Sequence, residues 1–267
     1  METIGLVAGY GELPILFAKA AKERGDRVVG FGLKGATSTS LEAHVEKMHW
    51  LEWGNLQKGI ILLATAGVKK IVLLGKIRKD LLFKNDAQLD EKASQMISTL
   101  KDKKDYAVLG GVTKMLKLAG ITVIDPTPYL SAFLPLKGTL TKGEPTKDEW
   151  DDIRYGCEIA GELARRDIGQ AVAVKEKTVI ALEAVEGTDE TIRRAGTLSN
   201  GGFTIVKVAR PDQDMRFDIP LIGLDTLKAL IAAKGRVLAL QEKKTLLIDK
   251  DEMIRLADEK GVAIVVV

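Results

Sequence analysis

The sequence predicts an α/β protein of two domains, with an N-terminal Rossmann-like parallel sheet flanked by helices and a C-terminal mixed α/β domain. In the first half, apolar strand patterns alternate with helical patterns, which is the rhythm of βαβ units. A stretch rich in proline and glycine, residues 125–145, then interrupts the periodicity. Beyond it, a long helical pattern precedes closely spaced strands. We therefore expect domains at residues 1–130 and 131–267.

The elements of the first domain follow from where each apolar pattern ends. TIGLVAG is an apolar run that stops at a glycine, and the helical pattern after it closes at Gly25. KKIVLLGKI is continuous and β-rich, as expected of a strand buried in a parallel sheet. The expected strands are 3–9, 27–33, 69–77 and 121–126, and the expected helices are 13–25, 55–67 and 105–120.

The second domain is expected to open with an amphipathic helix. The run QAVAVKEKTVIALEAVEG then reads as a hairpin that turns at Glu176–Lys177. The remaining expectations are a helix at 146–167, the hairpin at 170–187, a strand at 202–210, a strand and helix within 245–261, and a last strand at 262–267.

The composition is that of a soluble globular protein. Of the 267 residues, 46% are hydrophobic and 29% are charged, which is enough for an apolar core. The formal net charge is only +3, so we expect no nucleic acid partner, which normally requires a clustered basic face. No apolar run is long enough to span a bilayer. The single cysteine, Cys157, permits no internal disulfide and fits a cytoplasmic location.

A glycine-rich turn follows the first expected strand. The stretch AGYGELP, residues 8–14, leads into a helix, and at this position doubly wound folds bind phosphate or a nucleotide. The third glycine of the G-x-G-x-x-G dinucleotide pattern is missing after Gly9 and Gly11, and no acidic residue follows the second strand. Both departures count against a nicotinamide dehydrogenase. A tight turn without a ligand is the alternative.

Two cations lie at the end of a predicted central strand. The stretch VLLGKIRKD places Lys76 and Arg78 at a carboxyl end, and the carboxyl ends of parallel strands line the ligand crevice in such folds. These side chains are candidates for contacting a diphosphate. The alternative is a loop of solvated cations.

The stretch ALEAVEGTDETIRRAG, residues 181–196, gathers acidic residues at a strand end. Glu183, Glu186 and Asp189 cluster there, and Thr188 is a candidate N-cap for the helix that follows. A capped surface helix with ion pairs one turn apart is the alternative reading.

A second acidic stretch, RPDQDMRFDIPLIG, is interrupted by prolines and glycine and is therefore not expected to be helical. It carries Asp212, Asp214 and Asp218 together with Arg210 and Arg216. Carboxylates two or four residues apart can converge on one cation. A solvated loop is again the alternative.

The nature of any metal follows from the scarcity of soft ligands. The chain has two histidines, His44 and His49, and one cysteine, so a zinc site built from these residue types is not expected. A metal would be held by oxygen atoms, which favours Mg²⁺ or Mn²⁺.

Taken in order, these stretches resemble one family, the UDP-2,3-diacylglucosamine pyrophosphatases of lipid A biosynthesis, of the LpxI type. The matching segments are GLVAGYGELP, GKIRK, DIGQAVAVKEKTVIALEAVEGTDETIRRAG and VKVARPDQDMRFDIPLIG. The closing TLLIDKDEMIRLADEKGVAIVVV also looks like the family's C-terminal end. The resemblance covers nearly the whole chain, and EAVEGTDE and QDMRFDIPLIG are its most specific parts.

The resemblance implies hydrolysis of the diphosphate of UDP-2,3-diacylglucosamine to UMP and 2,3-diacylglucosamine 1-phosphate (lipid X). It also implies a divalent metal, usually Mg²⁺, and two domains that close over a lipid-nucleotide substrate. An aspartate of the C-terminal domain matters for catalysis in the family, and the family motif places it in the FDIPLIG stretch, which makes it Asp218 in this sequence.

These expectations assign roles that suit the chemistry. A diphosphate repels an attacking water, and a metal ion with fixed cations offsets that negative charge. The glycine turn would hold the uridine diphosphate. The expected catalytic residues are Asp218, Asp214 and Arg216; the expected metal ligands are Asp218, Glu186 and Asp189; and the expected substrate-binding residues are Gly9, Gly11, Glu12, Leu13, Lys76, Arg78 and Thr188.

Two other function classes remain open from the sequence. One is an oxidoreductase that uses a nicotinamide or nucleotide-sugar cofactor, suggested by the N-terminal βαβ pattern. The other is a non-catalytic nucleotide-binding module. A homodimer and a peripheral contact with the inner membrane also stay open.

Overall fold

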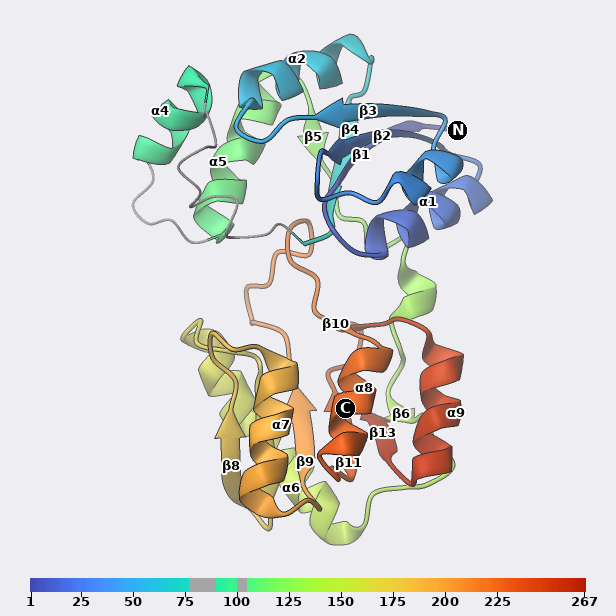
Figure 1. Ribbon diagram of the computed structural model, residues 1–267, viewed down its shortest axis with the longest axis vertical. Coiled ribbons are helices and arrows are strands. Elements are labelled where there is room, and N and C mark those ends of the chain that lie inside the picture. The colour runs from blue at the N-terminus through green and yellow to red at the C-terminus, as the bar shows by residue number, and fades with distance from the viewer. Residues whose placement is uncertain (77–89, 100–104) are drawn as a thin grey trace. The chain divides into compact units, whose positions relative to one another are not determined.

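A computed structural model of the chain describes residues 1–76, 90–99 and 105–267. These residues form two units. The first unit comprises Met1–Leu130 together with Met215–Phe217, and the second comprises Ser131–Asp214 together with Asp218–Val267. The first unit contains a parallel sheet and the second a mixed sheet, each with helices (Figure 1). The predicted α/β class with two domains is confirmed.

The first unit is built on a five-stranded parallel sheet with strand order β3-β2-β1-β4-β5. The expected strands and helices form within a few residues of their predicted bounds. The elements are β1 (Thr3–Ala8), α1 (Leu13–Glu23), β2 (Arg27–Leu33), the 3-10 helix η1 (Thr39–His44), β3 (Lys47–Leu51), α2 (Leu56–Thr65), β4 (Lys70–Leu74), α4 (Glu91–Thr99), α5 (Asp105–Leu118) and β5 (Thr122–Val123).

The two faces of this sheet are covered by different helices. Leu63 of α2 and Leu116 of α5 share a buried cluster with Val29, Phe31 and Ile71 of the strands. Successive strand side chains point to opposite faces, so the buried residues at the alternate positions of β1 and β2 face away from this cluster. Helix α1 packs against β1 and β2 (Figure 1).

The sequence did not predict β3 and α4. Strand β3 lies at the edge of the sheet, paired only with β2, and its KMHWL side chains are exposed or partly exposed. An edge strand needs no continuous apolar run, so its pattern was weak. Helix α4 has the polar sequence EKASQMIST, which gives little apolar periodicity.

The second unit holds a six-stranded mixed sheet with strand order β6-β13-β11-β9-β7-β8, and a separate parallel pair of short strands, β10 and β12. The elements are the 3-10 helix η2 (Ser131–Phe133), β6 (Gly138–Thr139), α6 (Lys147–Arg165), β7 (Ala171–Lys175), β8 (Thr178–Leu182), α7 (Thr188–Ser199), β9 (Thr204–Lys207), β10 (Leu221–Ile222), α8 (Leu224–Ala232), β11 (Val237–Leu240), β12 (Leu246–Leu247), α9 (Lys250–Lys260) and β13 (Ala263–Val266).

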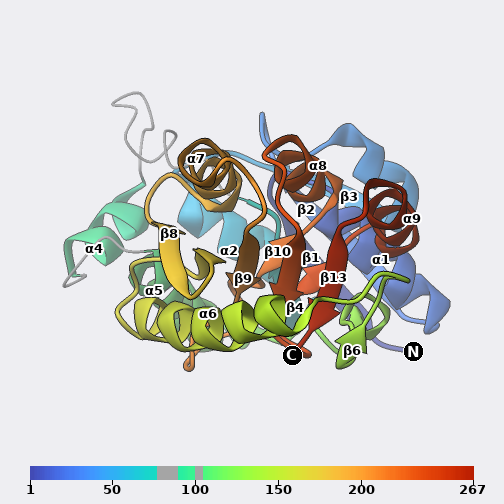
Figure 2. The ribbon, with the colours of Figure 1, turned by 90° about the horizontal axis from the view of Figure 1, so that it is seen from below.

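This unit has three layers. Helix α6 covers one face of the sheet, and α7, α8 and α9 cover the other (Figure 2). Ile153 and Ala160 of α6 pack on Val206 and Val265 in one buried cluster. The residues that the three other helices contribute to the opposite cluster are Ile192, Ala195, Leu227, Ala229, Leu230, Met253 and Ala257.

The predicted hairpin is confirmed. Strands β7 and β8 pair antiparallel, and both turn residues, Glu176 and Lys177, have positive φ angles of 52° and 55°. The buried carboxylate of Asp152 accepts hydrogen bonds from their main-chain N–H groups at 3.1 and 2.6 Å. Helix α6 therefore fixes the hairpin.

Several elements of the second unit were not predicted, among them the short strand β10 and the 3-10 helix η2. Helix α8 and strand β11 lie in a region that the sequence left unassigned, and β6 lies in the stretch expected to be a linker. Strand β6 is only two residues long and pairs with the end of β13, so no local pattern marks it. In the described ranges, no helix combines the length and apolarity needed to cross a bilayer.

Candidate functional site

The glycine turn of the first unit is joined to the end of β4 by main-chain hydrogen bonds. Gly9 donates to the carbonyl of Leu74 at 2.8 Å, and Tyr10 and Lys76 exchange two main-chain hydrogen bonds, each 2.8 Å. A side chain at Gly9 would place its Cβ 2.6 Å from the carbonyl oxygen of Lys76. The structure therefore brings Gly9 and Lys76 together, and glycine is needed for this close approach.

The start of α1 lies directly after this turn. Gly11 has a φ of +105°, and Glu12 is the N-cap residue without a side-chain hydrogen bond to the helix. Leu13 is partly buried, and Gly11 and Glu12 are exposed. The four predicted positions Gly9, Gly11, Glu12 and Leu13 therefore lie together at the carboxyl end of the sheet. A helix N-terminus at that place suits a phosphate group.

The structure describes Lys76 but not Arg78. Lys76 is exposed and follows β4 in the bridge to Tyr10. Arg78 lies outside the described residues, so its predicted phosphate contact stays a prediction.

In the second unit, Asp218 is held by two neighbours on the loop that follows β9. Arg210 Nη2 donates to Asp218 Oδ2 at 3.0 Å, and Gln213 Nε2 donates to the same oxygen at 2.8 Å. The Arg210 side chain is 14% exposed and the Asp218 side chain 49% exposed. Arg210 also pairs with Asp167. The largely covered guanidinium thus anchors a carboxylate that is half open to solvent.

The other charged residues of this loop have separate surroundings. Asp214 accepts a main-chain hydrogen bond from Asp218 N–H at 3.2 Å through its carbonyl oxygen. The Arg216 guanidinium carbon lies 4.8 Å from the centre of the Phe217 ring. Both residues belong to the segment Met215–Phe217 of the first unit, where Phe217 packs against the apolar cluster of α2 and α5. Asp212 is exposed.

A buried polar chain lies where β8 ends and α7 begins. Lys207 Nζ donates to Thr188 Oγ1 at 2.6 Å, and Thr188 Oγ1 donates to Glu183 Oε1 at 2.7 Å. Glu183 and Lys207 are each 8% exposed. Glu183 Oε2 accepts the main-chain N–H of Gln170 at 3.0 Å. The hydroxyl thus links a buried ammonium to a buried carboxylate, which offsets the cost of burying both charges.

The predicted N-cap role of Thr188 is wrong. Helix α7 begins at Thr188 and its N-cap is Gly187, with a φ of +85°. A hydroxyl has one proton, and that of Thr188 goes to Glu183. A contact between Thr188 and a phosphate oxygen would therefore use its main-chain N–H.

Glu186 and Asp189 are engaged with protein groups. Glu186 forms an ion pair with Arg194 at 2.7 Å. Asp189 Oδ1 accepts a hydrogen bond from Thr226 at 2.7 Å, which joins the first turns of α7 and α8. Within the described part of the chain, no three His, Cys, Asp or Glu side chains come together as a metal site. The expected set of Asp218, Glu186 and Asp189 is therefore not assembled as a group.

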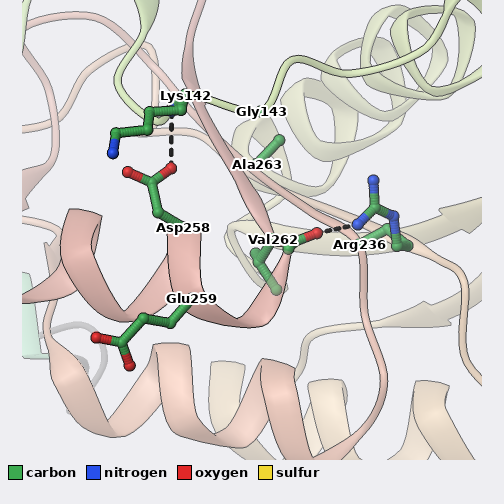
Figure 3. A pocket seen from close by; sticks show the side chains of 8 residues that line it. Lys142, Gly143, Arg236, Asp258, Glu259, Val262 and Ala263 are labelled. Carbon is green, nitrogen blue, oxygen red and sulfur yellow. Dashed lines mark hydrogen bonds between the residues drawn. The ribbon is translucent and has the colours of Figure 1, made fainter.

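The second unit has a cavity of about 420 Å³ at the end of the sheet where β11 and β13 begin (Figure 3). Its lining includes Arg236, just before β11, and Val262, just before β13. Lys142 N–H donates to Asp258 at 2.7 Å, and Arg236 donates to the carbonyl of Gly261. Arg236 also pairs with Glu149 at 3.4 Å, and none of the predicted site residues that the structure describes lines this cavity.

Sequence reasoning missed several residues of this region. Arg210 was noted only as a charge of the loop, and Gln170, Gln213 and Lys207 were not singled out. Their roles depend on side chains that meet across β7, β9 and the loop. The one local signal was a lysine inside the apolar run FTIVKVA, because a lysine there must be paired when it is buried.

Comparisons with known proteins agree along nearly the whole chain. The LpxI N-terminal domain model matches residues 3–133, and the LpxI C-terminal domain model matches residues 136–265. A relative from Caulobacter vibrioides, the UDP-2,3-diacylglucosamine pyrophosphatase LpxI, is 26% identical over 271 residues, covering 98% of this chain and 96% of that protein.

The solved structures that match are more distant. The biotin carboxylase subunit of pyruvate carboxylase has 17% identity and a TM-score of 0.30 over 65% of this chain and 35% of that chain. The biotin carboxylase domain of a thermophilic 2-oxoglutarate carboxylase has 14% identity and a TM-score of 0.30 over 73% and 33%. The chain spans about a third of each of these structures. The two domain models, matched in order, show that the chain belongs to the LpxI family.

Proposed function

We propose that this chain hydrolyses the diphosphate of UDP-2,3-diacylglucosamine to UMP and 2,3-diacylglucosamine 1-phosphate, in lipid A biosynthesis. The observation that carries the proposal is the similarity, along 98% of the chain, to a relative named as a pyrophosphatase of that substrate. The two LpxI domain models support the same assignment.

The proposal assigns the nucleotide to the first unit. The turn at Gly9 and Gly11 and the start of α1 provide main-chain N–H groups without a side-chain cap, which suits a phosphate group. Lys76, held beside the turn, adds a positive charge for the diphosphate. Arg78 and Arg216 are further predicted phosphate contacts.

The proposal assigns the attacking water to Asp218. Arg210 and Gln213 occupy Oδ2, and among the residues described no hydrogen bond reaches Oδ1. That oxygen can accept a hydrogen bond from the water, orient it and receive its proton. Asp214 is the second predicted catalytic carboxylate, and its main chain fixes the loop at Asp218.

The donor set fits a hard divalent cation. Mg²⁺ usually keeps several waters and uses one or two carboxylates together with substrate phosphates, so a site of three protein ligands is not required. Asp218 Oδ1 would hold either this cation or the attacking water, and Glu186 and Asp189, the other predicted ligands, are engaged with Arg194 and Thr226 and are not gathered with Asp218. Bound Mg²⁺ or Mn²⁺ would offset the negative charge that develops on the diphosphate.

Product analysis in water enriched in heavy oxygen tests the reaction. The purified chain is incubated with UDP-2,3-diacylglucosamine, and the products are weighed by mass spectrometry. We expect UMP and 2,3-diacylglucosamine 1-phosphate, one of them carrying a single heavy oxygen that identifies the phosphorus attacked. Absence of UMP release would refute the proposed hydrolysis.

Ligand titration tests the runner-up functions. We expect UDP to raise the melting temperature, because a ligand that binds the folded state stabilises it, and NADH to leave it unchanged. Stabilisation by NADH alone would favour the oxidoreductase. Stabilisation by UDP without any turnover would favour a binding module. The proposed location is the cytoplasm; membrane contact and a homodimer are separate questions for vesicle sedimentation and light scattering.

A further inference from the structure

The carboxamide of Gln213 lies between Asp218 and the rest of the second unit. Its Nε2 donates to the main-chain oxygen of Asp218 at 2.6 Å and to Oδ2 at 2.8 Å. Its Oε1 accepts from the main-chain N–H and Nε of Arg210 at 3.1 and 3.3 Å, and from Gln170 Nε2 at 3.3 Å. A carboxamide offers two N–H donors, so both are used on Asp218.

These partners leave one orientation for the carboxamide. If its oxygen and nitrogen exchanged places, the NH₂ group would face three N–H donors, and the oxygen would face the two oxygens of Asp218. Exchanged, the carboxamide would lose all five hydrogen bonds. The donor end must therefore point at Asp218, as the network requires.

Gln170 connects this carboxamide to the sheet. It directly precedes β7, and its main-chain N–H donates to the buried Glu183 at 3.0 Å. Its carbonyl oxygen accepts from Val208 N–H at 2.9 Å. A catalytic group is held most accurately when its support lies on a regular element, and here the support extends from β7 through Gln170 and Gln213 to Asp218.

The effect is to give the two oxygens of Asp218 different surroundings. Oδ2 accepts from Gln213 and from Arg210 Nη2, whereas in the described ranges no hydrogen bond reaches Oδ1. The terminal torsion of an aspartate is broad, and its side chain here is 49% exposed. Without the two donors the carboxylate would rotate, and Oδ1 would lose its fixed direction.

We infer that Gln213 is a positioning residue of the hydrolysis, which holds Oδ2 of Asp218 and directs Oδ1 at the water or metal. The inference rests on the proposed function, since that function gives Asp218 its chemical role. Gln213 acts through Asp218 and does not itself contact the substrate.

The first test compares two substitutions of similar size. Gln213→Met removes every hydrogen bond of the carboxamide. Gln213→Glu keeps its shape but replaces the donor end by an oxygen facing Asp218. We expect kcat to fall about 10- to 100-fold, with KM within about threefold, because misplacing a reacting group by about 1 Å costs this much. Gln213→Glu should be the slower variant. A side chain that only fills space would leave kcat of both unchanged.

Gln241→Met is the matched control. Gln241 Oε1 accepts the main-chain N–H of Ala209 at 2.8 Å, so this variant also loses a glutamine hydrogen bond to the chain after β9 and leaves Asp218 untouched. We expect a lower melting temperature with unchanged kcat. Equal losses of kcat in the Gln241 and Gln213 variants would show that the loop backbone matters, and would overturn the inference.

A double-mutant cycle tests the link through Gln170. Gln170→Met alone should lower kcat about three- to tenfold, and adding it to Gln213→Met should cause no further loss, because both act on the same carboxylate. If the two kcat losses multiplied in the double variant, Gln170 and Gln213 would act independently, and the link from Gln170 through Gln213 to Asp218 would be refuted.

A spectroscopic measurement separates this inference from the proposed function. The Nε2 protons of Gln213 should be shifted in the nitrogen–proton NMR spectrum of the wild-type chain, and Asp218→Ala should move them to ordinary carboxamide positions. If the wild type releases no UMP, the proposed function fails, while these resonances still test the contact. Unchanged resonances in Asp218→Ala would reject the contact even in an active enzyme.

Discussion

The glycine turn of the first unit and the segment of the second unit that carries Arg210, Gln213 and Asp218 both follow the carboxyl end of a strand, yet they are held in different ways. The turn is fixed by main-chain bonds between Gly9, Tyr10 and the end of β4. The loop is fixed by side chains, chiefly Arg210 and Gln213 around Asp218. Added atoms should therefore damage the turn, and lost functional groups should damage the loop.

The largest expected effect is at Asp218, because activity at this side-chain-held loop should depend on one carboxylate. Asp218→Asn should keep the fold and lower kcat by about 10³-fold or more, since its amide cannot accept the proton of the water. UMP release measures the rate. Asp212→Asn, an exposed aspartate on the same loop, is the control and should retain activity. Turnover close to wild type in Asp218→Asn would remove this residue from the mechanism.

Chelation should separate the two regions. EDTA should reduce UMP release by about 100-fold or more, because metal charge stabilisation is worth several kcal/mol, and added Mg²⁺ should restore it. UMP should still bind to the glycine turn in EDTA, since main-chain donors need no metal. The rise in melting temperature that UMP causes measures this binding. Full activity in EDTA would argue against a metal requirement.

The next effect is on stability, at the buried lysine beside the loop. Lys207→Met leaves the buried carboxylate of Glu183 without its cationic neighbour, which should cost about 3 kcal/mol. This corresponds to a fall in melting temperature of about 10 °C for a unit of this size.

Lys175→Met is the control for that measurement. Lys175 lies on β7 and donates to the carbonyl oxygens of Ser199 and Gly201, which are neutral, so its loss should cost about 1 kcal/mol. Equal melting temperatures for the two variants would show that the link from Lys207 to Glu183 contributes little.

Gly9→Ala tests the turn with the smallest side chain. The added Cβ would lie 2.6 Å from the carbonyl oxygen of Lys76, so we expect a loss of about 1–3 kcal/mol from overpacking and a raised KM. Gly59→Ala in α2 is the matched control, because its Cβ would meet only Leu51 at 3.9 Å, and alanine there should stabilise by about 0.5–1 kcal/mol. Tolerance of Gly9→Ala would refute the close-approach argument.

The smallest effect lies outside both regions, at Asp26. The main-chain N–H of Glu2, and further the Tyr129 hydroxyl and Arg24, lower the pKa of Asp26 below its ordinary value of 3.8. The stability this carboxylate contributes is therefore present above that value and lost as pH falls through the folded pKa. Asp26→Asn should lower the melting temperature slightly near neutral pH, and the difference should shrink as pH falls below 3.8 and vanish once the carboxyl is protonated in both the folded and unfolded states. A difference that persists in acid would contradict this assignment.

The sequence predicted the fold well where elements are apolar and local. Buried strands such as β1 and β4 have continuous apolar runs, and the hairpin turn at Glu176–Lys177 follows from its place between two strand patterns. Edge strand β3 and the two-residue strand β6 escaped prediction, because their pairing depends on distant neighbours.

The candidate site also has a part that local sequence predicted and a part that it did not. The glycine turn and the acidic loop were recognisable because each is one short stretch. Thr188 was assigned as a cap on local pattern, although tertiary structure uses its hydroxyl to connect Glu183 with Lys207.

By itself, the sequence determined the α/β class, the LpxI resemblance and the residue types available for an oxygen-bound metal. These follow from hydrophobic periodicity and contiguous motifs, which are properties of short segments. Only the tertiary structure decided that Gly9 meets the end of β4 and that Gln213 holds one oxygen of Asp218. Such contacts join residues from different strands and loops, and they form only when the sheets bring those segments together.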